Sequence, residues 1–555
     1  MPVWFNRAAM RSPTRRPLSR PLALAAIMAL TDSLGGCATS SPTPATPVVP
    51  HFVDEAATGI SHRYTGGFDF FVGGGVATFD CNGDGRPDLY FAGGADPAAL
   101  YRNESVVGGA LRFVRVPAPA TDLTSVTGAY PIDLDSDGII DLVVLRNGAP
   151  NVVLRGLGDC GFEPANDRFG IDAGNGWTTA FSATWEGGNQ LPTLAFGSYL
   201  NAHRDACADS QLIRPAADGS RYDPPLSLAP GYCTLSMLFS DWSGRGEADL
   251  RVTNDRHYYT AGEDQLWKVA PGEPPRQYTD ADGWRPVQVW GMGIASRDVT
   301  GDGYNDVFLT SQGDNKLQSL DAGAAGPSFH DIALRRGVTA QRPAFGGDVL
   351  PSTAWHPEFA DVNNDGLVDL FVSKGNVDAQ TDHASRDPSD LFIQQPDGTF
   401  VDRAEAAGVV NLDRARGAAL VDLNLDGMLD LVVVNREAEV RLWRNVGTGD
   451  AGHARLTAHW IELRVHQRAP NVDAIGAWVD VQVGAHTDTR EITVGGGHAS
   501  GELGSLHFGI ANASSARVRV RWPGGEVGPW IKVSANQFVT IERGANNATP
   551  SQLPN

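Results

Sequence analysis

Cysteine and lysine are scarce in this chain of 555 residues, which has five cysteines and four lysines. No two cysteines have the C-x-x-C spacing, so a thiolate zinc site is not expected. The patterns G-x-S-x-G, H-E-x-x-H and G-x-x-x-x-G-K are also absent, which favours a protein that is not an enzyme. Acidic residues outnumber basic ones, 65 to 44, and the net charge of -21 disfavours binding to nucleic acid.

The N-terminus has the pattern of an export signal. Arginines without acidic residues precede the apolar run 21–30 (PLALAAIMAL), which is too short to span the roughly 30 Å of a bilayer core. The following run LGGC, which ends at Cys37, resembles a bacterial lipobox. We therefore expect a signal peptide over residues 1–36 and lipidation of Cys37. The Arg15-Arg16 pair resembles a twin-arginine signal, so both export routes stay open.

The exported chain is then a lipoprotein of the outer membrane, the cell surface or the periplasm, attached to a membrane by its lipid anchor alone. Residues 37–50 are small and rich in proline, as in an extended tether. Four cysteines follow, and an even number in an oxidising compartment predicts disulfides. Cys207 and Cys233 bracket a loop and are expected to pair, and so, with less support from the sequence, are Cys81 and Cys160.

One pattern recurs along most of the chain. It begins at seven positions that lie 51 to 63 residues apart. These starts are Asp80, Asp133, Thr184, Asp241, Asp298, Asp361 and Asp422. Each unit has an acidic turn followed by a short β-branched or aromatic run such as LVVL or LFVS, which indicates a strand. Units of this length with about four strands are typical of propeller blades, so we predict an all-β protein with a seven-bladed propeller over residues 51–447.

The ends of the repeat predict that the propeller closes into a ring. A strand that begins with phenylalanine comes late in the units, at Phe329 and Phe400, and a further copy at Phe52 precedes the first acidic turn. The last unit ends without its own copy. The N-terminal segment is therefore expected to complete the last blade and to cover its open edge.

Five of the turns follow D-x-[DNT]-x-D-G-x-x-D, in which glycine permits a sharp bend and the polar side chains converge. Calcium takes six to eight oxygen ligands, so four side chains, a carbonyl at position 7 and water would complete one site. Position 12 lies in a strand and is never glutamate, which excludes an EF-hand. About five structural calcium ions are expected. The predicted side-chain ligands are Asp80, Asn82, Asp84, Asp88, Asp133, Asp135, Asp137, Asp141, Asp298, Thr300, Asp302, Asp306, Asp361, Asn363, Asp365, Asp369, Asp422, Asn424, Asp426 and Asp430, and the carbonyls belong to Arg86, Ile139, Tyr304, Leu367 and Met428.

The alternative is an ordinary solvated turn that binds nothing. It is disfavoured because five copies place several carboxylates together at the same spacing, and their repulsion has a cost unless a cation offsets it. Two units depart from the pattern. The unit at Asp241 has Arg245 at the fifth position, where the guanidinium is expected to replace the ion, and the unit at Thr184 keeps only the turn and the strand.

The C-terminal part has alternating segments such as WVDVQV and RVRVRW, which predict a small β-sandwich or barrel over residues 458–543, with a disordered tail at 544–555. The acidic repeats resemble FG-GAP and VCBS repeats of integrin-like propellers. The segments NVDAIGAWVDVQVG and REITVGGGHASGELGSLHFGIA resemble the ASPIC/UnbV domain that follows such repeats. The resemblance implies calcium in the repeats and a protein related to cartilage acidic protein.

Two functions stay open. The first is a non-enzymatic binding, adhesion or scaffold protein, a monomer whose ligand is an unknown protein or glycan. The second is an extracytoplasmic hydrolase or oxidoreductase that acts at the mouth of the propeller channel. Its candidate residues precede the turns and are His62, Trp177, Trp290, His356 and Glu358. A convergence of histidines and carboxylates would favour the enzyme, and a featureless channel would favour binding.

Overall fold

The computed structural model describes residues 46–255, 262–339, 352–378, 380 and 383–551. The predicted signal peptide, Cys37, most of the tether and residues 552–555 lie outside this range. Strands dominate the described part, which confirms the all-β prediction. The short helices there are α1 (Asn166–Phe169), α2 (Ala333–Arg336) and α3 (Ala404–Ala407), with 3-10 turns at Phe68–Phe70 and Asp280–Asp282.

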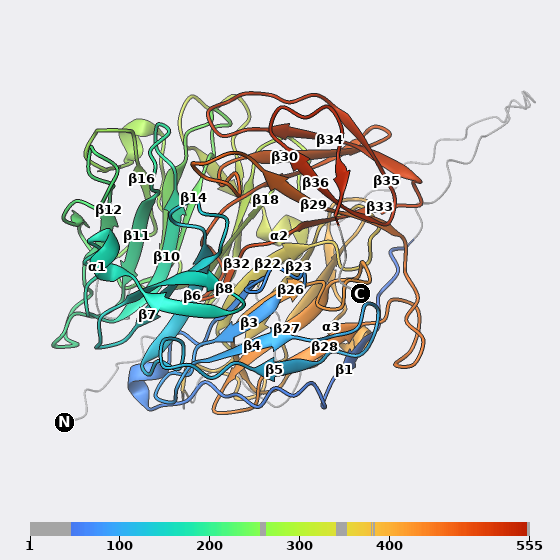
Figure 1. The fold of residues 1–555 in the computed structure, drawn as a ribbon, viewed down its shortest axis with the longest axis horizontal. Coiled ribbons are helices and arrows are strands. Elements are labelled where there is room, and N and C mark those ends of the chain that lie inside the picture. The colour runs from blue at the N-terminus through green and yellow to red at the C-terminus, as the bar shows by residue number, and fades with distance from the viewer. Residues whose placement is uncertain (1–45, 256–261, 340–351, 379, 381–382, 552–555) are drawn as a thin grey trace, which may run out of the picture. The chain divides into compact units, whose positions relative to one another are not determined.

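Seven sheets form the propeller, each with four antiparallel strands that we call a blade (Figure 1). The sheet of blade 1 has a fifth strand, which comes from the C-terminal part of the chain. The innermost strands of blades 1 to 7 are β2 (Val76–Phe79), β6 (Val126–Ile132), β10 (Thr178–Thr184), β14 (Thr234–Ser240), β18 (Gly291–Arg297), β22 (Ala354–Ala360) and β26 (Arg414–Val421). Each innermost strand contacts the next, and β26 contacts β2. The blades therefore surround a central channel in a closed ring.

The second strand of each blade follows the turn of its repeat. These strands are β3 (Asp88–Phe91), β7 (Asp141–Arg146), β11 (Thr193–Ser198), β15 (Asp249–Asn254), β19 (Asp306–Ser311), β23 (Asp369–Lys374) and β27 (Asp430–Arg436). They are buried on both faces between neighbouring blades, which explains their nearly continuous apolar sequences. In the five acidic repeats, the last aspartate of the turn is the first residue of this strand.

The outer strands complete each blade. The third strands are β4 (Ala99–Asn103), β8 (Val152–Gly158), β12 (Ser210–Ile213), β16 (Gln265–Lys268), β20 (Lys316–Leu320), β24 (Asp390–Gln394) and β28 (Arg441–Asn445). The outermost strands of blades 1 to 6 are β5 (Phe113–Arg115), β9 (Gly161–Pro164), β13 (Leu226–Leu228), β17 (Arg276–Gln277), β21 (Phe329–Asp331) and β25 (Phe400–Asp402).

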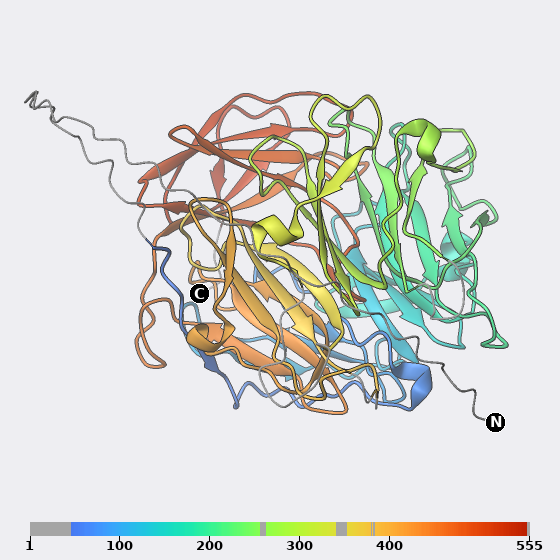
Figure 2. The same cartoon turned by 180° about the vertical axis from the view of Figure 1, so that it is seen from behind.

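The N-terminal strand closes the ring. Strand β1 (Phe52–Asp54) pairs antiparallel with β28 of blade 7, and Phe52 lies opposite Asn445. Figure 2 shows this blue strand beside the orange strands of the last blade. The predicted closure is thus confirmed, and the pairing covers an edge that would otherwise expose unpaired backbone groups.

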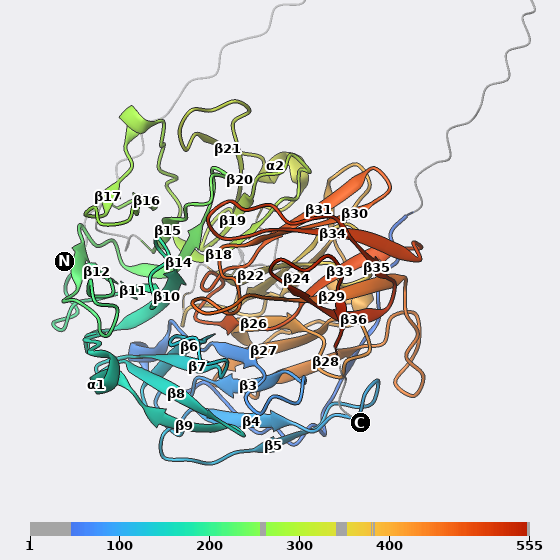
Figure 3. The same cartoon turned by 45° about the horizontal axis from the view of Figure 1, so that its top comes forward.

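Two further four-stranded sheets form the C-terminal domain (Figure 3). One contains β33 (Leu506–Ala511), β29 (His459–His466), β36 (Gln537–Glu542) and β37 (Thr549–Pro550), and the other contains β31 (His486–Glu491), β30 (Trp478–Val483), β34 (Ser515–Arg521) and β35 (Ile531–Ser534). The prediction of a disordered tail from residue 544 is wrong at β37, because this strand pairs with β36. Apolar residues of both sheets belong to one buried cluster that continues into the propeller.

Candidate functional site

The first aspartate of each acidic turn folds the turn around itself. In blade 1, Asp80 accepts hydrogen bonds from the backbone N–H of Gly83 at 2.7 Å and of Gly85 at 2.8 Å. The other four turns repeat the bond from the sixth residue at 2.7–2.8 Å. This sixth residue has φ between +82° and +88° in all five turns, a conformation that favours glycine.

The ninth aspartate joins the turn to the sheet. One of its oxygens accepts the backbone N–H of the second turn residue at 2.8–3.1 Å in all five turns. In four turns the other oxygen accepts an N–H from the third strand at 2.7–2.8 Å. The first and ninth aspartates therefore keep their carboxylates inside the turn, although each oxygen retains a second lone pair for another ligand.

In the turn of blade 2 the side chains converge as a calcium site requires. Carboxylate oxygens of Asp133, Asp135 and Asp141 in blade 2 lie within 4.8 Å of one another. Two oxygens bound to one calcium ion at about 2.3–2.6 Å are separated by no more than about 5 Å. The third position supplies a further observation, because Oδ1 of Asp135 and Oδ1 of Asn424 are buried without a hydrogen-bond partner. The residues of the blade 2 turn therefore fit a calcium ion, and the unpartnered oxygen of Asn424 suits an ion in blade 7.

Burial makes the charge on these carboxylates costly. It raises the pKa of Asp88 and Asp133 to about 7 and that of Asp141 to about 8, and neighbouring carboxylates add to the shifts. In blades 6 and 7 burial raises four further pKa values well above the ordinary range, with contributions from nearby acidic groups. These four are Asp361, Asp369, Asp422 and Asp430. A divalent cation among these groups would stabilise their ionised forms.

Arginines neutralise part of the charge in two blades. Arg86 lies 3.2 Å from Asp84 in blade 1. In blade 2, Arg155 lies 3.2 Å from Asp135 and also contacts Asp137. No such ion pair with a turn carboxylate occurs in blades 5 to 7 within the described part of the chain. The turn carboxylates of blades 5 to 7 therefore have no cationic side chain as a partner within the described residues.

The two divergent turns are stabilised without a cation. In blade 4, Asp249 accepts hydrogen bonds from Trp242 Nε1 at 2.7 Å and from the Tyr278 hydroxyl at 2.8 Å. Arg245 does not take the place of the ion as expected: its side chain is exposed and makes no ion pair within the described residues. In blade 3, Glu186 pairs with Arg214 at 2.7 Å. Neutral donors and an ion pair thus satisfy the turn carboxylates of these two blades.

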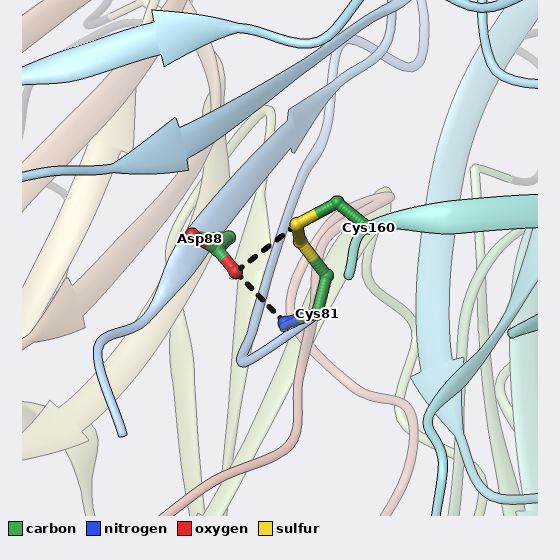
Figure 4. A group of neighbouring side chains, drawn as sticks. All are labelled: Cys81, Asp88 and Cys160. Carbon is green, nitrogen blue, oxygen red and sulfur yellow. Dashed lines mark hydrogen bonds between the residues drawn. A yellow bond between two sulfur atoms is a disulfide. The ribbon is translucent and has the colours of Figure 1, made fainter. Parts of the chain in front are cut away.

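The cysteines form the two predicted disulfides, Cys81–Cys160 and Cys207–Cys233. Figure 4 shows the first of these beside Asp88, whose carboxylate accepts the backbone N–H of Cys81 at 2.8 Å and lies 3.9 Å from Cys160 Sγ. Both sulfurs are bonded to each other, so this group offers no thiolate to a metal. The disulfide instead joins the turn of blade 1 to the outer hairpin of blade 2.

A loop of the C-terminal domain fills the propeller channel. Residues 493–502 (TVGGGHASGE) leave β31 and form β-bridges with the innermost strands of blades 2 to 5. Strand β32 (Gly501–Glu502) then pairs parallel with β2 of blade 1. We call residues 493–502 the plug. Gly495 is required here, because it has φ +121° and a Cβ would lie 2.7 Å from the carbonyl oxygen of Met237.

His498 lies at the tip of the plug and is fully buried. Its Nδ1 lies 3.0 Å from the carbonyl oxygen of Met292, its Nε2 accepts the N–H of Gly73 at 3.1 Å, and its ring lies 4.9 Å from that of Trp355. These partners require the neutral form protonated on Nδ1. Burial accordingly lowers the pKa of His498 to about 3.

The residues considered for an enzyme do not form one open site. His356 and Glu358 lie together, with His356 Nε2 3.4 Å from Glu358 Oε2, and His356 Nδ1 accepts the N–H of His498 in the plug at 3.0 Å. His62 lies elsewhere and contacts the carbonyl oxygen of Ala92, while Trp177 packs in an apolar cluster. A cavity of about 140 Å³ remains beside the plug. Sequence reasoning missed His498 as a packing residue, although the preceding three glycines could have indicated a close backbone approach.

Ionic contacts also join the C-terminal domain to the propeller. Arg297 at the end of β18 pairs with Asp488 of β31 at 2.7 Å, and these side chains are 3% and 7% exposed. Glu491 accepts the hydroxyl of Ser240 at 2.6 Å and the N–H of Asp241 at 2.8 Å. Burial raises the pKa of Glu491 to about 8. The domain therefore docks directly on the face of the propeller that carries the turns.

Comparisons with known proteins support both parts of this architecture. An FG-GAP-like repeat model matches residues 80–144 and 298–372, and a model of the ASPIC and UnbV family matches residues 467–548. Cartilage acidic protein 1 from Mus musculus is 30% identical over 167 residues, and its Homo sapiens counterpart is 29% identical over 172 residues. Each match covers 28% of this chain and 22% of the relative, so it spans about a fifth of the relative's length.

Two solved structures show a partial similarity to this chain. BBS1N, in a complex with ARL6DN, has a TM-score of 0.41 at 10% identity and covers 72% of this chain and 98% of its own. The BP39L lectin from Burkholderia pseudomallei has a TM-score of 0.43 at 12% identity, with coverage of 68% and 97%. In the described residues, no helix is both long and apolar enough to cross a membrane.

Proposed function

We propose that this chain, which contains FG-GAP-like repeats and an ASPIC and UnbV domain, is an exported binding or scaffold protein stabilised by calcium. The observation that carries the proposal is the plug. Because residues 493–502 occupy the channel, the place where a propeller enzyme would bind its substrate is filled by the protein itself. His356 and Glu358 are engaged there in contacts with the plug and with strand β26.

Calcium would be held by the five acidic turns. The polar side chains at positions 1, 3, 5 and 9 of each turn, together with the carbonyl of position 7, supply the oxygen ligands that this ion prefers. When bound, the ion would neutralise the buried carboxylates. The orphaned oxygens of Asp135 and Asn424 support this role, as does the absence of an ion pair at the described turn carboxylates of blades 5 to 7.

Export is supported by the two disulfides, which are typical of proteins outside the cytoplasm. We further propose that Cys37 carries the lipid anchor and that the tether holds the propeller away from the membrane. In this arrangement the parent protein should appear in the membrane fraction of the cells, and the Cys37→Ala variant should appear in the soluble fraction. A variant that stays with the membrane would contradict the anchor.

Thermal melting tests the role of calcium. The soluble chain from residue 38 should melt at a lower temperature in chelator, and calcium should restore the transition because a ligand of the folded state stabilises it. Asp422→Asn in blade 7 should reduce the calcium-induced increase. The matched variant Asp241→Asn alters the same turn position in blade 4 and should leave that increase unchanged. A melting temperature that ignores both chelator and calcium would refute the proposal.

A further inference from the structure

A cleft of about 970 Å³ lies between the C-terminal domain and the two divergent blades. Its propeller wall consists of the turns of blades 3 and 4, residues 184–188 and 245–248, with the end of β16. Its other wall consists of the loop after β29, the loop after β34 and the end of β36. None of the five acidic turns, all of which are described, lines this cleft. The blades without a calcium pattern are thus the blades that face it.

Most charged groups in the cleft already have partners. Glu186 pairs with Arg214, Glu491 accepts the bonds from Ser240 and Asp241, Glu542 pairs with His466 at 2.8 Å, and Arg543 pairs with Glu526 at 2.7 Å. These groups are already engaged in contacts within the protein.

Two arginines on opposite walls are free. Arg245 belongs to the propeller and Arg468 to the C-terminal domain, and both side chains are exposed. Within the described residues neither guanidinium makes an ion pair or a hydrogen bond. The lining has five carboxylates and three guanidinium groups. Among these groups, only Arg245, Arg468 and the carboxylate of Glu247 lack a partner within the described residues. The half-buried indole of Trp185 also lines the cleft, and its Nε1 is buried without a partner.

We propose that this cleft binds a short saccharide that carries uronate carboxylates. Guanidinium groups bind carboxylates through two parallel hydrogen bonds, and a polar cleft with an indole suits a sugar ring. The volume lies within the range of ligand sites for molecules of this size. The net charge of -21 disfavours long polyanions, so the ligand has few charged groups. The inference rests on the proposed binding role and does not depend on calcium.

Isothermal titration calorimetry of the soluble chain with digalacturonate tests the inference. Arg245→Ala and Arg468→Ala should each weaken binding about tenfold, because each removes one charge-assisted contact, and the double variant should show no measurable heat. Arg112→Ala is the matched control, since this arginine is 70% exposed on blade 1, and it should leave the affinity unchanged. The neutral disaccharide with the same linkage should bind at least tenfold more weakly.

Several results would overturn the inference. Absence of binding to digalacturonate, equal binding of the neutral disaccharide, or unchanged affinity in both arginine variants would each do so. An arginine variant that melts at a lower temperature than the parent would leave its loss of binding open to another explanation. In that case Arg468→Glu, which reverses the charge, is assayed below its melting transition and must also lose binding. A chain that is stabilised by calcium but fails to bind the acidic sugar would refute the cleft assignment and leave the proposed calcium-stabilised scaffold standing.

Discussion

His498→Ala tests whether the plug is held as tightly as its contacts indicate. The substitution leaves the N–H of Gly73 and the carbonyl of Met292 unpaired in the interior, at about 1–3 kcal/mol for each group. It also removes the ring contact with Trp355, which contributes about 0.5–1.5 kcal/mol. The free energy that holds the plug in the channel should therefore fall by about 3–7 kcal/mol.

Hydrogen–deuterium exchange followed by mass spectrometry measures this loss at the plug itself, which a melting curve of the whole chain does not resolve. Peptides that cover residues 493–502 should exchange at least about a hundredfold faster in His498→Ala than in the parent protein. His453→Ala is the control, because that side chain is 94% exposed. Equal protection of the plug in both variants would refute the packing role assigned to His498.

Three further predictions concern charge and covalent linkage. Burial raises the pKa of Asp141 to about 8. Without calcium, the stability that this group contributes is therefore complete below about pH 4 and is lost as the pH rises through 8. Calcium should raise the melting temperature more at pH 8 than at pH 5, and equal increases at the two pH values would contradict this prediction. Arg297→Ala leaves Asp488 buried without its partner and should cost about 3–5 kcal/mol in denaturant unfolding, whereas Arg297→Met with Asp488→Leu should recover most of it. Joint replacement of Cys81 and Cys160 by serine removes a disulfide between residues 79 positions apart and should lower the free energy of unfolding by about 4–5 kcal/mol. An unchanged denaturant unfolding transition would show that this disulfide does not stabilise the protein.

The repeated elements could be predicted from the sequence because each repeats a local physical constraint. The glycine at the sixth turn position and the buried second strand that begins at the ninth recur at fixed positions of the turn, and the strand at Phe52 repeats the late strand of other units. The pairing of Cys207 with Cys233 was also predictable, since the two residues bracket one loop.

The plug and the cleft have no such repetition. The segment 493–502 lies between two strands of the C-terminal domain, and its glycines indicate that another part of the protein lies close to its backbone. The sequence does not indicate which part that is. That the propeller channel is its neighbour depends on contacts between residues hundreds of positions apart. The error over Arg245 has the same origin, because the hydroxyl of Tyr278 and the indole of Trp242 already satisfy Asp249.

Calcium content tests the central claim most directly. The soluble chain from residue 38, freed of loosely bound metal by gel filtration, should contain about five calcium ions per molecule by mass spectrometry of the element. Asp422→Asn should lower this number by one, and Asp241→Asn should leave it unchanged. A parent protein that contains no calcium after exposure to the ion, or equal contents in the two variants, would contradict the account.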